Sequence, residues 1–444
     1  MASLSPGVQP TSLNNVSLFP YFFHEVIMRI AMYLGILLAS WSLASSEEST
    51  PATLVLTNIS VSERARSHSP AVRAGRAEVE ASSAQRSAQL SPFLPQVGAR
   101  MDYRRWGSEP DMGTRHSYQG QIQVEQQLLT FGRLRSTRSL TADAIRAAET
   151  DLYGDQRDAA LRALIALEGY RFAQATVTVA QARLEQRQGE YADAQKLFEV
   201  GNVPMLDVRE ARINVARAED SLAQVRADAQ RARADLAAAL AMEEQAFTVA
   251  DDLARPNDLD AILAQAHEHL LDGIDLERLT IARESTQTQA DLELIDSLPQ
   301  VSGIAAATTS GSRLNDMDDD WYVGIGLSWT LYDGGGRYAR RNAQQANLRR
   351  IQAQRDAILD ERQRELAVIQ ADASALAARI ALQESIISDT EANYEDARVL
   401  YQTGEITLTR VGEAGLAVVE AQFNRNRYLF EESVLAHRLQ AFME

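Results

Sequence analysis

Two short stretches decide the fold: Leu197-Phe198-Glu199-Val200-Gly201-Asn202-Val203 and, 203 residues later, Leu400-Tyr401-Gln402-Thr403-Gly404-Glu405-Ile406. Each stretch places a glycine where one long helical pattern stops and another begins. Glycine suits the end of a helix because it tolerates left-handed dihedral angles. Each stretch therefore predicts a sharp turn between two helices, and the recurrence predicts a duplicated chain.

The residues before each turn predict a helix of unusual length. Residues 133–200 contain no proline, and residues 336–403 contain no proline and no internal glycine. Each run of roughly 65 residues gives about 100 Å of helix at 1.5 Å per residue. Large side chains recur every seven residues with alanines between them, which predicts a coiled-coil seam. They are Tyr170, Val177, Leu184, Tyr191 and Phe198 in the first run and Ile380, Ile387, Tyr394 and Tyr401 in the second.

Upstream of each long run, apolar residues occupy every second position, in residues 97–103, 122–124 and 323–331. Such alternation predicts strands with one apolar and one polar face. Strands of about 10 residues have the length that crosses a bilayer in a tilted barrel. Aromatic residues near the strand ends predict the girdles that flank the apolar band of membrane barrels. The predicted girdle residues are Trp106, Trp321, Tyr322, Trp329 and Tyr332.

The two halves of the chain share one plan. Leu-Pro-Gln-Val at residues 94–97 recurs 204 residues later, at 298–301. A period of about 200 residues indicates a duplicated domain rather than a solenoid unit. We predict a first repeat over residues 61–252 and a second over residues 253–444, each with a first helix, two strands, a long helix and a return helix. The first helices are expected over residues 61–87 and 257–295, ahead of a proline in both cases.

The amino terminus predicts an export signal. Residues 30–43 form the one long apolar run, preceded by Arg29 and followed by small residues that a signal peptidase reads. We predict that residues 1–44 comprise an over-extended gene start and a signal peptide, with translation beginning at Met28. An N-terminal membrane anchor is the alternative, although the run is short for a spanning helix. Residues 45–60 are expected to form an extended periplasmic lead-in.

Composition argues against several classes of function. The net charge is −17, which argues against a nucleic-acid binder, and the absence of cysteine excludes disulfides, thiol nucleophiles and Cys-ligated metals. No local motif indicates an enzyme, so we expect no catalytic residue, no metal and no cofactor. His267-Glu268-His269 lacks the spacing of a helical zinc site and is expected at the surface. The acidic run at residues 316–320 lacks the glycine and glutamate of an EF-hand and is expected to be a solvated loop.

The order of these features resembles the TolC-type outer-membrane efflux protein family, the outer membrane factors. The resemblance spans nearly the whole mature chain. It implies a fold that is mainly α with membrane β-strands, in which three protomers give four strands each to one 12-stranded β-barrel that an α-helical barrel continues. The stretch Leu331-Tyr332-Asp333-Gly334-Gly335-Gly336-Arg337 looks like the family's strand-to-helix turn, with Gly132 in the corresponding place of the first half. The resemblance also rests on residues 74–81, residues 94–97 and the two glycine turns.

The resemblance implies a homotrimeric duct in the cell outer membrane, in contact with its lipid, with a long periplasmic extension. It implies passive conduction of substrates delivered by an inner-membrane transporter and a periplasmic adaptor, in efflux or type I secretion. The adaptor is expected to dock on the helix tips, at Leu197, Val200, Gly201, Val203, Leu400, Gly404 and Ile406.

Charged residues after each turn are expected to converge as rings in a threefold tube and to hold a periplasmic gate. They are Asp207, Arg209, Glu210, Arg410 and Glu413. Arg410 and Glu413 stand where the family usually has aspartates, so the gating chemistry is expected to differ. A soluble periplasmic coiled-coil scaffold is the alternative function. It explains the heptads and the signal peptide, but not the strands of membrane length in both halves.

Overall fold

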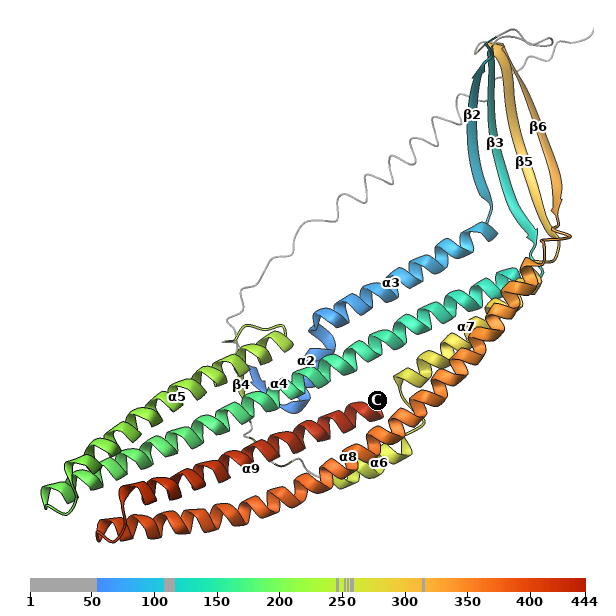
Figure 1. Ribbon diagram of the computed structural model, residues 1–444. Coiled ribbons are helices and arrows are strands. Elements are labelled where there is room, and N and C mark those ends of the chain that lie inside the picture. The colour runs from blue at the N-terminus through green and yellow to red at the C-terminus, as the bar shows by residue number, and fades with distance from the viewer. Residues whose placement is uncertain are drawn as a thin grey trace, which may run out of the picture. The chain divides into compact units, whose positions relative to one another are not determined.

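The computed structural model describes residues 54–107, 116–244, 247–250, 253, 255, 259–313 and 316–444. The predicted signal peptide and residues 45–53 of the lead-in lie outside the described residues. Four helices, in two hairpins, and a four-stranded antiparallel sheet account for most of the described chain (Figure 1). None of the described helices is both long and apolar enough to cross a membrane.

The two long helices are present as predicted. Helix α4 covers Arg133–Glu199 and helix α8 covers Gly336–Gln402, each with 67 residues. The return helices are α5 (Met205–Ala239) and α9 (Leu408–Met443). Helices α4 and α9 pack against each other, so the hairpins α4–α5 and α8–α9 lie side by side (Figure 1).

Both hairpins turn through the same hydrogen-bonded cap. Gly201 and Gly404 are left-handed, with φ of 79° and 82°. In the first turn the amide of Asn202 donates to the carbonyl of Leu197 at 2.8 Å, and the second turn repeats this bond 203 residues later at 2.9 Å. This Schellman arrangement satisfies carbonyls that the end of a helix leaves without a partner. The quoted turns therefore fix where each hairpin reverses.

The seven-residue period is confirmed, but along the predicted seam of α4 the alanines are buried more deeply than the large residues. Ala180 and Ala194 are buried, whereas Tyr170 and Leu184 are half-buried and Phe198 is exposed. Small side chains let neighbouring helices approach closely, so larger neighbours lie at the margin of the contact. The buried apolar residues of α9 keep the heptad spacing along the whole helix: Val411, Ala414, Val418, Ala421, Leu435, Leu439 and Phe442.

Each predicted first helix is in fact a pair, so the prediction of single helices was wrong. The first pair is α2 (Asn58–His68) and α3 (Pro70–Leu90), and the second is α6 (Leu259–Glu268) and α7 (Ile274–Ile295). Ser69 is extended, with ψ of 140°, because a residue before proline avoids the helical region. In the second half the chain changes direction at Gly273, whose φ is 136°.

The predicted lead-in ends in regular structure. Strand β1 (Leu54–Leu56) pairs in parallel with β4 (Phe247–Val249). Leu56 and Phe247 pack with Leu167 of α4 in one fully buried cluster. Close to it, Arg171 donates to Glu168 at 2.7 Å and to the side chain of Asn58 at 2.9 Å. The start of the described chain is thereby tied to the middle of α4.

The sheet has the strand order β2-β3-β5-β6, all antiparallel. Its strands are β2 (Gln96–Arg105), β3 (His116–Leu129), β5 (Gln300–Arg313) and β6 (Asp316–Ser328), preceded by the short 3₁₀ helix η1 (Ser91–Phe93). The strand was predicted to continue to residue 331, but β6 ends at Ser328, so Trp329 and Leu331 lie outside it. The reason is the turn into α8, which takes over at that point.

The register gives the sheet one apolar and one polar face. Val97 lies opposite Val124, Val124 opposite Ala305, and Ala305 opposite Val323. Side chains alternate along a strand, so apolar residues of all four strands share one face, where Ile325 is 76% exposed. The opposite face carries mainly polar side chains: Gln96, Arg100, Asp102, Gln119, Gln121, Gln123, Thr308, Ser310, Asp318 and Asp320.

We predict opposite stability effects for two glycine substitutions. An added Cβ meets no atom within 4 Å at Gly201 or at Gly189, so the pair isolates the backbone effect. Gly201→Ala is expected to cost about 1–2 kcal/mol, because an L-residue resists the left-handed region. Gly189→Ala is expected to stabilise α4 by about 0.5–1 kcal/mol, because Gly189 lies inside that helix. Denaturant unfolding of both variants measures the change in the free energy of unfolding. A change of the same sign in both variants contradicts the left-handed turn assigned to Gly201.

Candidate functional site

The predicted docking residues at the hairpin turns divide into an exposed group and a half-buried group. Val200 is 70% exposed, and Leu400, Gly201 and Gly404 also reach the surface. The other three, by contrast, pack in a cluster that joins the two hairpins, around buried Val411. These packed residues are Leu197, Val203 and Ile406. They shape the tip from inside rather than offering a contact surface.

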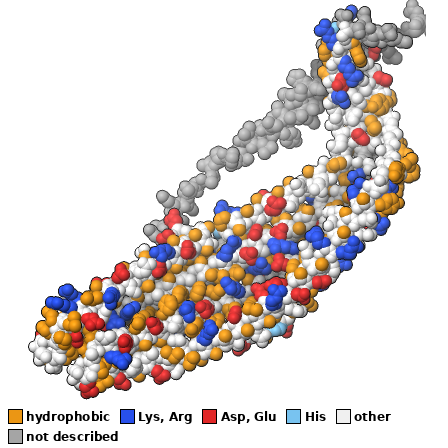
Figure 2. Space-filling view, viewed as in Figure 1, with side chains coloured by type: hydrophobic (Ala, Val, Ile, Leu, Met, Phe, Trp, Pro, Cys, Tyr) orange, Lys and Arg blue, Asp and Glu red, His pale blue; other side chains and the backbone are white. Residues whose placement is uncertain are grey.

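Sequence reasoning missed further apolar residues that the first turn exposes. Leu206 is 69% exposed, and Met205 and Phe198 are also exposed. Figure 2 shows hydrophobic side chains at the surface around the hairpin ends. Met205 and Leu206 begin α5 directly after Pro204, ahead of the heptad seam that starts at Val208. For Met205 and Leu206 the signal was their position outside the seam period, whereas Phe198 lies on the predicted seam of α4.

The predicted gate charges do not bridge the two hairpins within the chain. Arg410 Nη1 pairs with Glu413 Oε2 at 3.1 Å, one turn along the same exposed face of α9. Arg209 is exposed on α5. Asp207 and Glu210 instead lie near the phenol of Tyr401. Burial first, and then the negative charges around it, raise the pKa of Tyr401 to about 12.

A buried polar cluster does join the hairpins. Arg187 and Glu190, both on α4, form an ion pair of 2.7 Å, with side chains 7% and 3% exposed. Arg187 Nη2 donates to the carbonyl of Gly412 on α9 at 3.1 Å, and the Tyr394 hydroxyl on α8 donates to Glu190 Oε1 at 3.3 Å. Burial, followed by the charge of Glu190, raises the pKa of Tyr394 above its ordinary value.

Residues closer to the turns add a second link between α4 and α8. Arg398 approaches Asp193 at 3.4 Å, and Gln402 Nε2 donates to the same carboxylate at 3.0 Å. The signal for both links was present in the sequence. Arg187 falls seven residues after Ala180 and seven before Ala194, so a charge occupies a position where the seam buries alanine.

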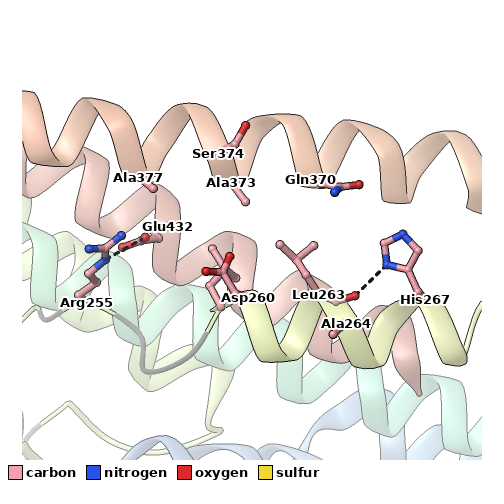
Figure 3. A pocket seen from close by; sticks show the side chains of 11 residues that line it. Arg255, Asp260, Leu263, Ala264, His267, Gln370, Ala373, Ser374, Ala377 and Glu432 are labelled. Carbon is pink, nitrogen blue, oxygen red and sulfur yellow. Dashed lines mark hydrogen bonds and ion pairs between the residues drawn. The ribbon is translucent and has the colours of Figure 1, made fainter.

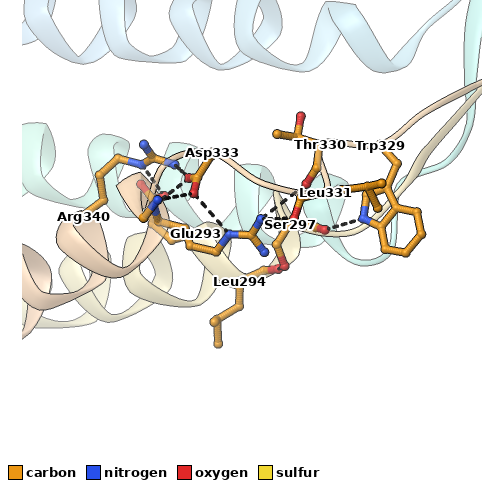
Figure 4. A network of polar contacts seen from close by, with 10 residues as sticks. Glu293, Leu294, Ser297, Trp329, Thr330, Leu331, Asp333 and Arg340 are labelled. Atoms are coloured by element: carbon orange, nitrogen blue, oxygen red, sulfur yellow. Dashed lines mark hydrogen bonds and ion pairs between the residues drawn. The ribbon is translucent and has the colours of Figure 1, made fainter.

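The strand-to-helix turn before α8 is a network of hydrogen bonds around one carboxylate (Figure 4). Asp333 accepts from the backbone amides of Gly335 at 3.2 Å and Arg337 at 2.7 Å. Arg340 bridges Asp333 and Glu293 of α7, at 3.5 Å and 2.7 Å. Partial burial raises the pKa of Asp333, but these amides and the two guanidinium groups outweigh it and hold the pKa below its usual range.

The predicted glycines of this turn have different conformations. Gly334 and Gly335 are left-handed, with φ of 68° and 84°, while Gly336 is the first residue of α8. In the first half Gly132 is left-handed and precedes α4, with φ of 96°. Arg133 there reaches Asp296 at the end of α7, at 3.5 Å. Both long helices are therefore anchored to α7.

The predicted girdle aromatics lie on different sides of the sheet. Trp321 is opposite Ala307 on the apolar face, whereas Tyr322 is on the polar face, where Gln121 Nε2 donates to its hydroxyl at 3.5 Å. The register thus removes Tyr322 from the predicted girdle. Trp329 Nε1 donates to the carbonyl of Ser297 at 3.0 Å. Trp106 and Tyr332 are exposed beyond the strands.

A cavity of about 720 Å³ opens between α6, α8 and α9 (Figure 3). Its floor holds Glu432, 1% exposed, whose Oε1 accepts from Arg255 Nε at 3.2 Å. His267 lines this cavity and is exposed, as expected from the sequence, with Nδ1 3.0 Å from the carbonyl of Leu263 on its own helix. Within the described ranges, no group of His, Asp and Glu could hold a metal ion.

We predict that Asp333→Asn lowers the melting temperature at pH 7 and has a smaller effect at pH 3. The pKa of Asp333 is lowered in the fold, so its stabilisation is present at neutral pH and is lost as the pH falls through that pKa. Asp372→Asn, at an exposed site on the same helix, is the control and is expected to be neutral at both pH values. An equal loss at both pH values argues against a charge-dependent cap.

Residues 61–242 and 267–429 match the family described as outer membrane efflux protein. A comparison with curated proteins gave no match. Among solved structures, CusC superposes with a TM-score of 0.75 at 15% identity, covering 90% of this chain and 95% of CusC. VceC of Vibrio cholerae gives 0.70 at 17% identity, covering 87% and 95%.

MtrE, an outer membrane channel of Neisseria gonorrhoeae, gives a TM-score of 0.69 at 15% identity, covering 90% of this chain and 96% of MtrE. At such identities the likeness concerns the fold, which is that of paired long helices joined to an antiparallel sheet. The family match extends over both repeats and both hairpins. This chain therefore belongs to the outer membrane efflux protein family.

Proposed function

We propose that three copies of this chain form a passive outer-membrane duct for substrates delivered by an inner-membrane transporter and a periplasmic adaptor, in efflux or type I secretion. One observation carries the proposal: a four-stranded sheet with an exposed apolar face and two open edges continues into helices of 67 residues. Lipid requires the apolar face, and the helices supply the length for a periplasmic extension.

The open edges support assembly from several copies. Strands β2 and β6 each have one neighbour in the sheet. Backbone groups at a sheet edge find no partner in hydrocarbon, so membrane sheets close into barrels. Three copies with four strands each give the even number that single-chain outer-membrane barrels also have. The helices repeat the pattern, because α5 and α8 are the outer members of the packing order α5-α4-α9-α8.

Adaptor docking at the hairpin ends is supported by exposed apolar surface. Val200 and Leu206 carry most of it, with Phe198, Met205 and Leu400 beside them. The cluster around Val411 keeps both tips in one rigid unit, so this surface is preorganised. An aqueous duct has no other evident need for such residues at its periplasmic end.

A gate at the same end is supported by the polar links between α4 and α8. Tyr394 and Arg398 attach α8 to Glu190 and Asp193 of α4. Separating the hairpins breaks these bonds, and Glu190 then keeps Arg187 as its intrahelical partner. The polar links are few, but separation also opens the apolar cluster around Val411, so contacts with the docked adaptor have to replace that burial. The predicted gate residues Asp207, Arg209, Glu210, Arg410 and Glu413 are proposed to make contacts between copies.

The scaffold alternative fits the sheet poorly. A soluble protein rarely leaves a contiguous apolar face uncovered. Here the exposed face combines residues of all four strands, among them Val97, Met101, Val323, Ile325 and Leu327. Lipid contact accounts for that face, and a coiled-coil scaffold does not.

We predict that a charge on the apolar face blocks membrane insertion and that the same charge on the polar face does not. Ile325→Lys is expected to cost about 2–4 kcal/mol near mid-membrane depth and to shift the protein out of the outer-membrane fraction. Thr308→Lys, on the opposite face, is the matched control. The fraction that resists carbonate extraction measures both. Full insertion of the Ile325 variant contradicts lipid contact at this face, whereas extraction of the unmodified chain by carbonate favours the soluble scaffold.

We predict that Tyr394→Phe increases the open probability of the channel in planar bilayers. The substitution removes the hydrogen bond that joins α8 to Glu190, a bond to a charged group worth about 1.5–3 kcal/mol. Tyr191→Phe is the control, because the equivalent tyrosine of the first repeat bonds Gln195 on its own helix. An unchanged open probability for Tyr394→Phe removes this link from the gate.

A further inference from the structure

The two open edges of the sheet carry opposite charges at the same end. The end in question is the one away from the helices, where β2 finishes and β6 begins; we call it the outer end. There β2 carries Arg104 and Arg105, and β6 carries Asp318, Asp319 and Asp320. Figure 2 shows basic and acidic side chains together in this part of the sheet.

These charges have no ionic partner among the described residues. All five side chains are exposed. The charges nearer the helices are already used, because Arg100 Nε pairs with Asp102 at 2.7 Å within β2. Asp320 accepts only the adjacent backbone amide of Trp321, at 2.8 Å, among the described groups. Charged groups at the rim of a membrane sheet are costly unless they are paired or hydrated.

Charge selects which edges can meet. A contact between two β6 edges sets aspartates against aspartates, and one between two β2 edges sets arginines against arginines. Like charges directly opposite each other destabilise a strand pair. Copies that insert in the same direction would also make these homotypic pairs parallel, unlike the rest of the sheet. A β6 edge against the β2 edge of another copy is antiparallel, brings opposite charges together and is a head-to-tail contact that can close into a ring.

The two faces of the sheet restrict the register of this contact. Odd-numbered residues of β2 and of β6 occupy the apolar face. A slip by one residue would turn one strand's apolar side chains to the polar face, so only even slips are allowed. Aligning the helix-side ends, with Ser328 opposite Gln96, meets this condition. Trp321 then lies opposite Tyr103, Asp320 opposite Arg104 and Asp319 opposite Arg105.

We propose that a second copy of this chain pairs its β2 edge with β6 in this register, and that Asp319 and Asp320 form ion pairs with Arg105 and Arg104 of the partner subunit to fix it. The proposal rests on the proposed function, since it specifies how copies join in the duct. The apolar residue pairs on the helix side of these charges supply most of the contact between the two strands. The ion pairs choose one register from those that the faces allow, which is the usual role of charge at an interface.

Cysteine pairs test the register directly, because the native chain has no cysteine. Directly opposite residues have Cα atoms about 4.5–5.5 Å apart, within disulfide reach, and a two-residue slip moves them beyond it. The test pair is Asp320→Cys with Arg104→Cys. A second pair in the same register, Tyr322→Cys with Asp102→Cys, leaves both ion-pairing residues of the test pair in place. The offset control is Tyr322→Cys with Arg104→Cys.

After oxidation in the outer membrane, the test pair and the second pair are expected to give covalent trimers on a denaturing gel, and the offset control only monomers. Cross-linking of the offset control overturns the proposed register. Light scattering of the detergent-extracted variants gives the number of copies in each particle, which distinguishes a wrong register from the absence of a trimer. A trimer that neither in-register pair cross-links overturns the seam alone, whereas a monomer overturns the duct together with the seam.

Charge reversal tests the ion pairs. Asp320→Arg and Arg104→Asp, each alone, are expected to weaken trimer assembly by up to roughly fivefold per seam. The double variant restores the pair with its polarity exchanged and is expected to regain assembly. Thr308→Arg, on the same face inside the sheet, controls for added charge. Equal assembly of the single and double variants overturns the role of the charges.

Discussion

Every backbone amide and carbonyl needs a partner, and this requirement governs the whole chain. The long helices meet it internally, except at their ends, where the turns at Gly201 and Gly404 supply the remaining bonds. The sheet meets it only between its strands, so β2 and β6 are left with one open edge each. The helical part is therefore complete in one chain, while the sheet is not. In the proposed duct, assembly of several copies completes the hydrogen bonding of the sheet edges.

The two halves share one order of elements, but they make different side-chain contacts at the equivalent positions. At the strand-to-helix turns, the second half uses Asp333 to bind the backbone of α8, and the first half uses Arg133 to reach Asp296 on α7. Near the tips, Tyr394 bonds across to α4, whereas Tyr191 bonds within its own helix. Both repeats contribute donors to the links between the hairpins, because Tyr394 of α8 donates to Glu190 and Arg187 of α4 donates to the carbonyl of Gly412.

Alanine seams and buried ion pairs contribute differently to the hairpin contact. The seams bring the helices close, because small residues let backbones approach. The Arg187–Glu190 pair adds little net stability, since burying charges costs roughly what their attraction returns. Its bonds to Gly412 and Tyr394 nevertheless need one relative position of the hairpins. Such a cluster specifies the relative position of the hairpins more than it adds to stability.

Sequence alone determined the elements that depend on local or periodic signals. The long helices end within two residues of the predicted positions, because proline, glycine and the heptads act locally. Alternation likewise located strands on which one face is apolar. The breaks at Ser69 and Gly273 were missed, although Pro70 and Gly273 are themselves local signals of a helix boundary.

Only the tertiary structure decided which residues meet across the duplication. Leu197, Val203 and Ile406 were expected at the surface but pack between hairpins, and Tyr322 turned out to share a face with Gln121 rather than with Trp321. The Glu190–Tyr394 bond joins residues 204 positions apart. Periodicity fixes which side of its own helix or strand a residue occupies. It does not fix what the neighbouring element places there, because that depends on how two distant segments pack.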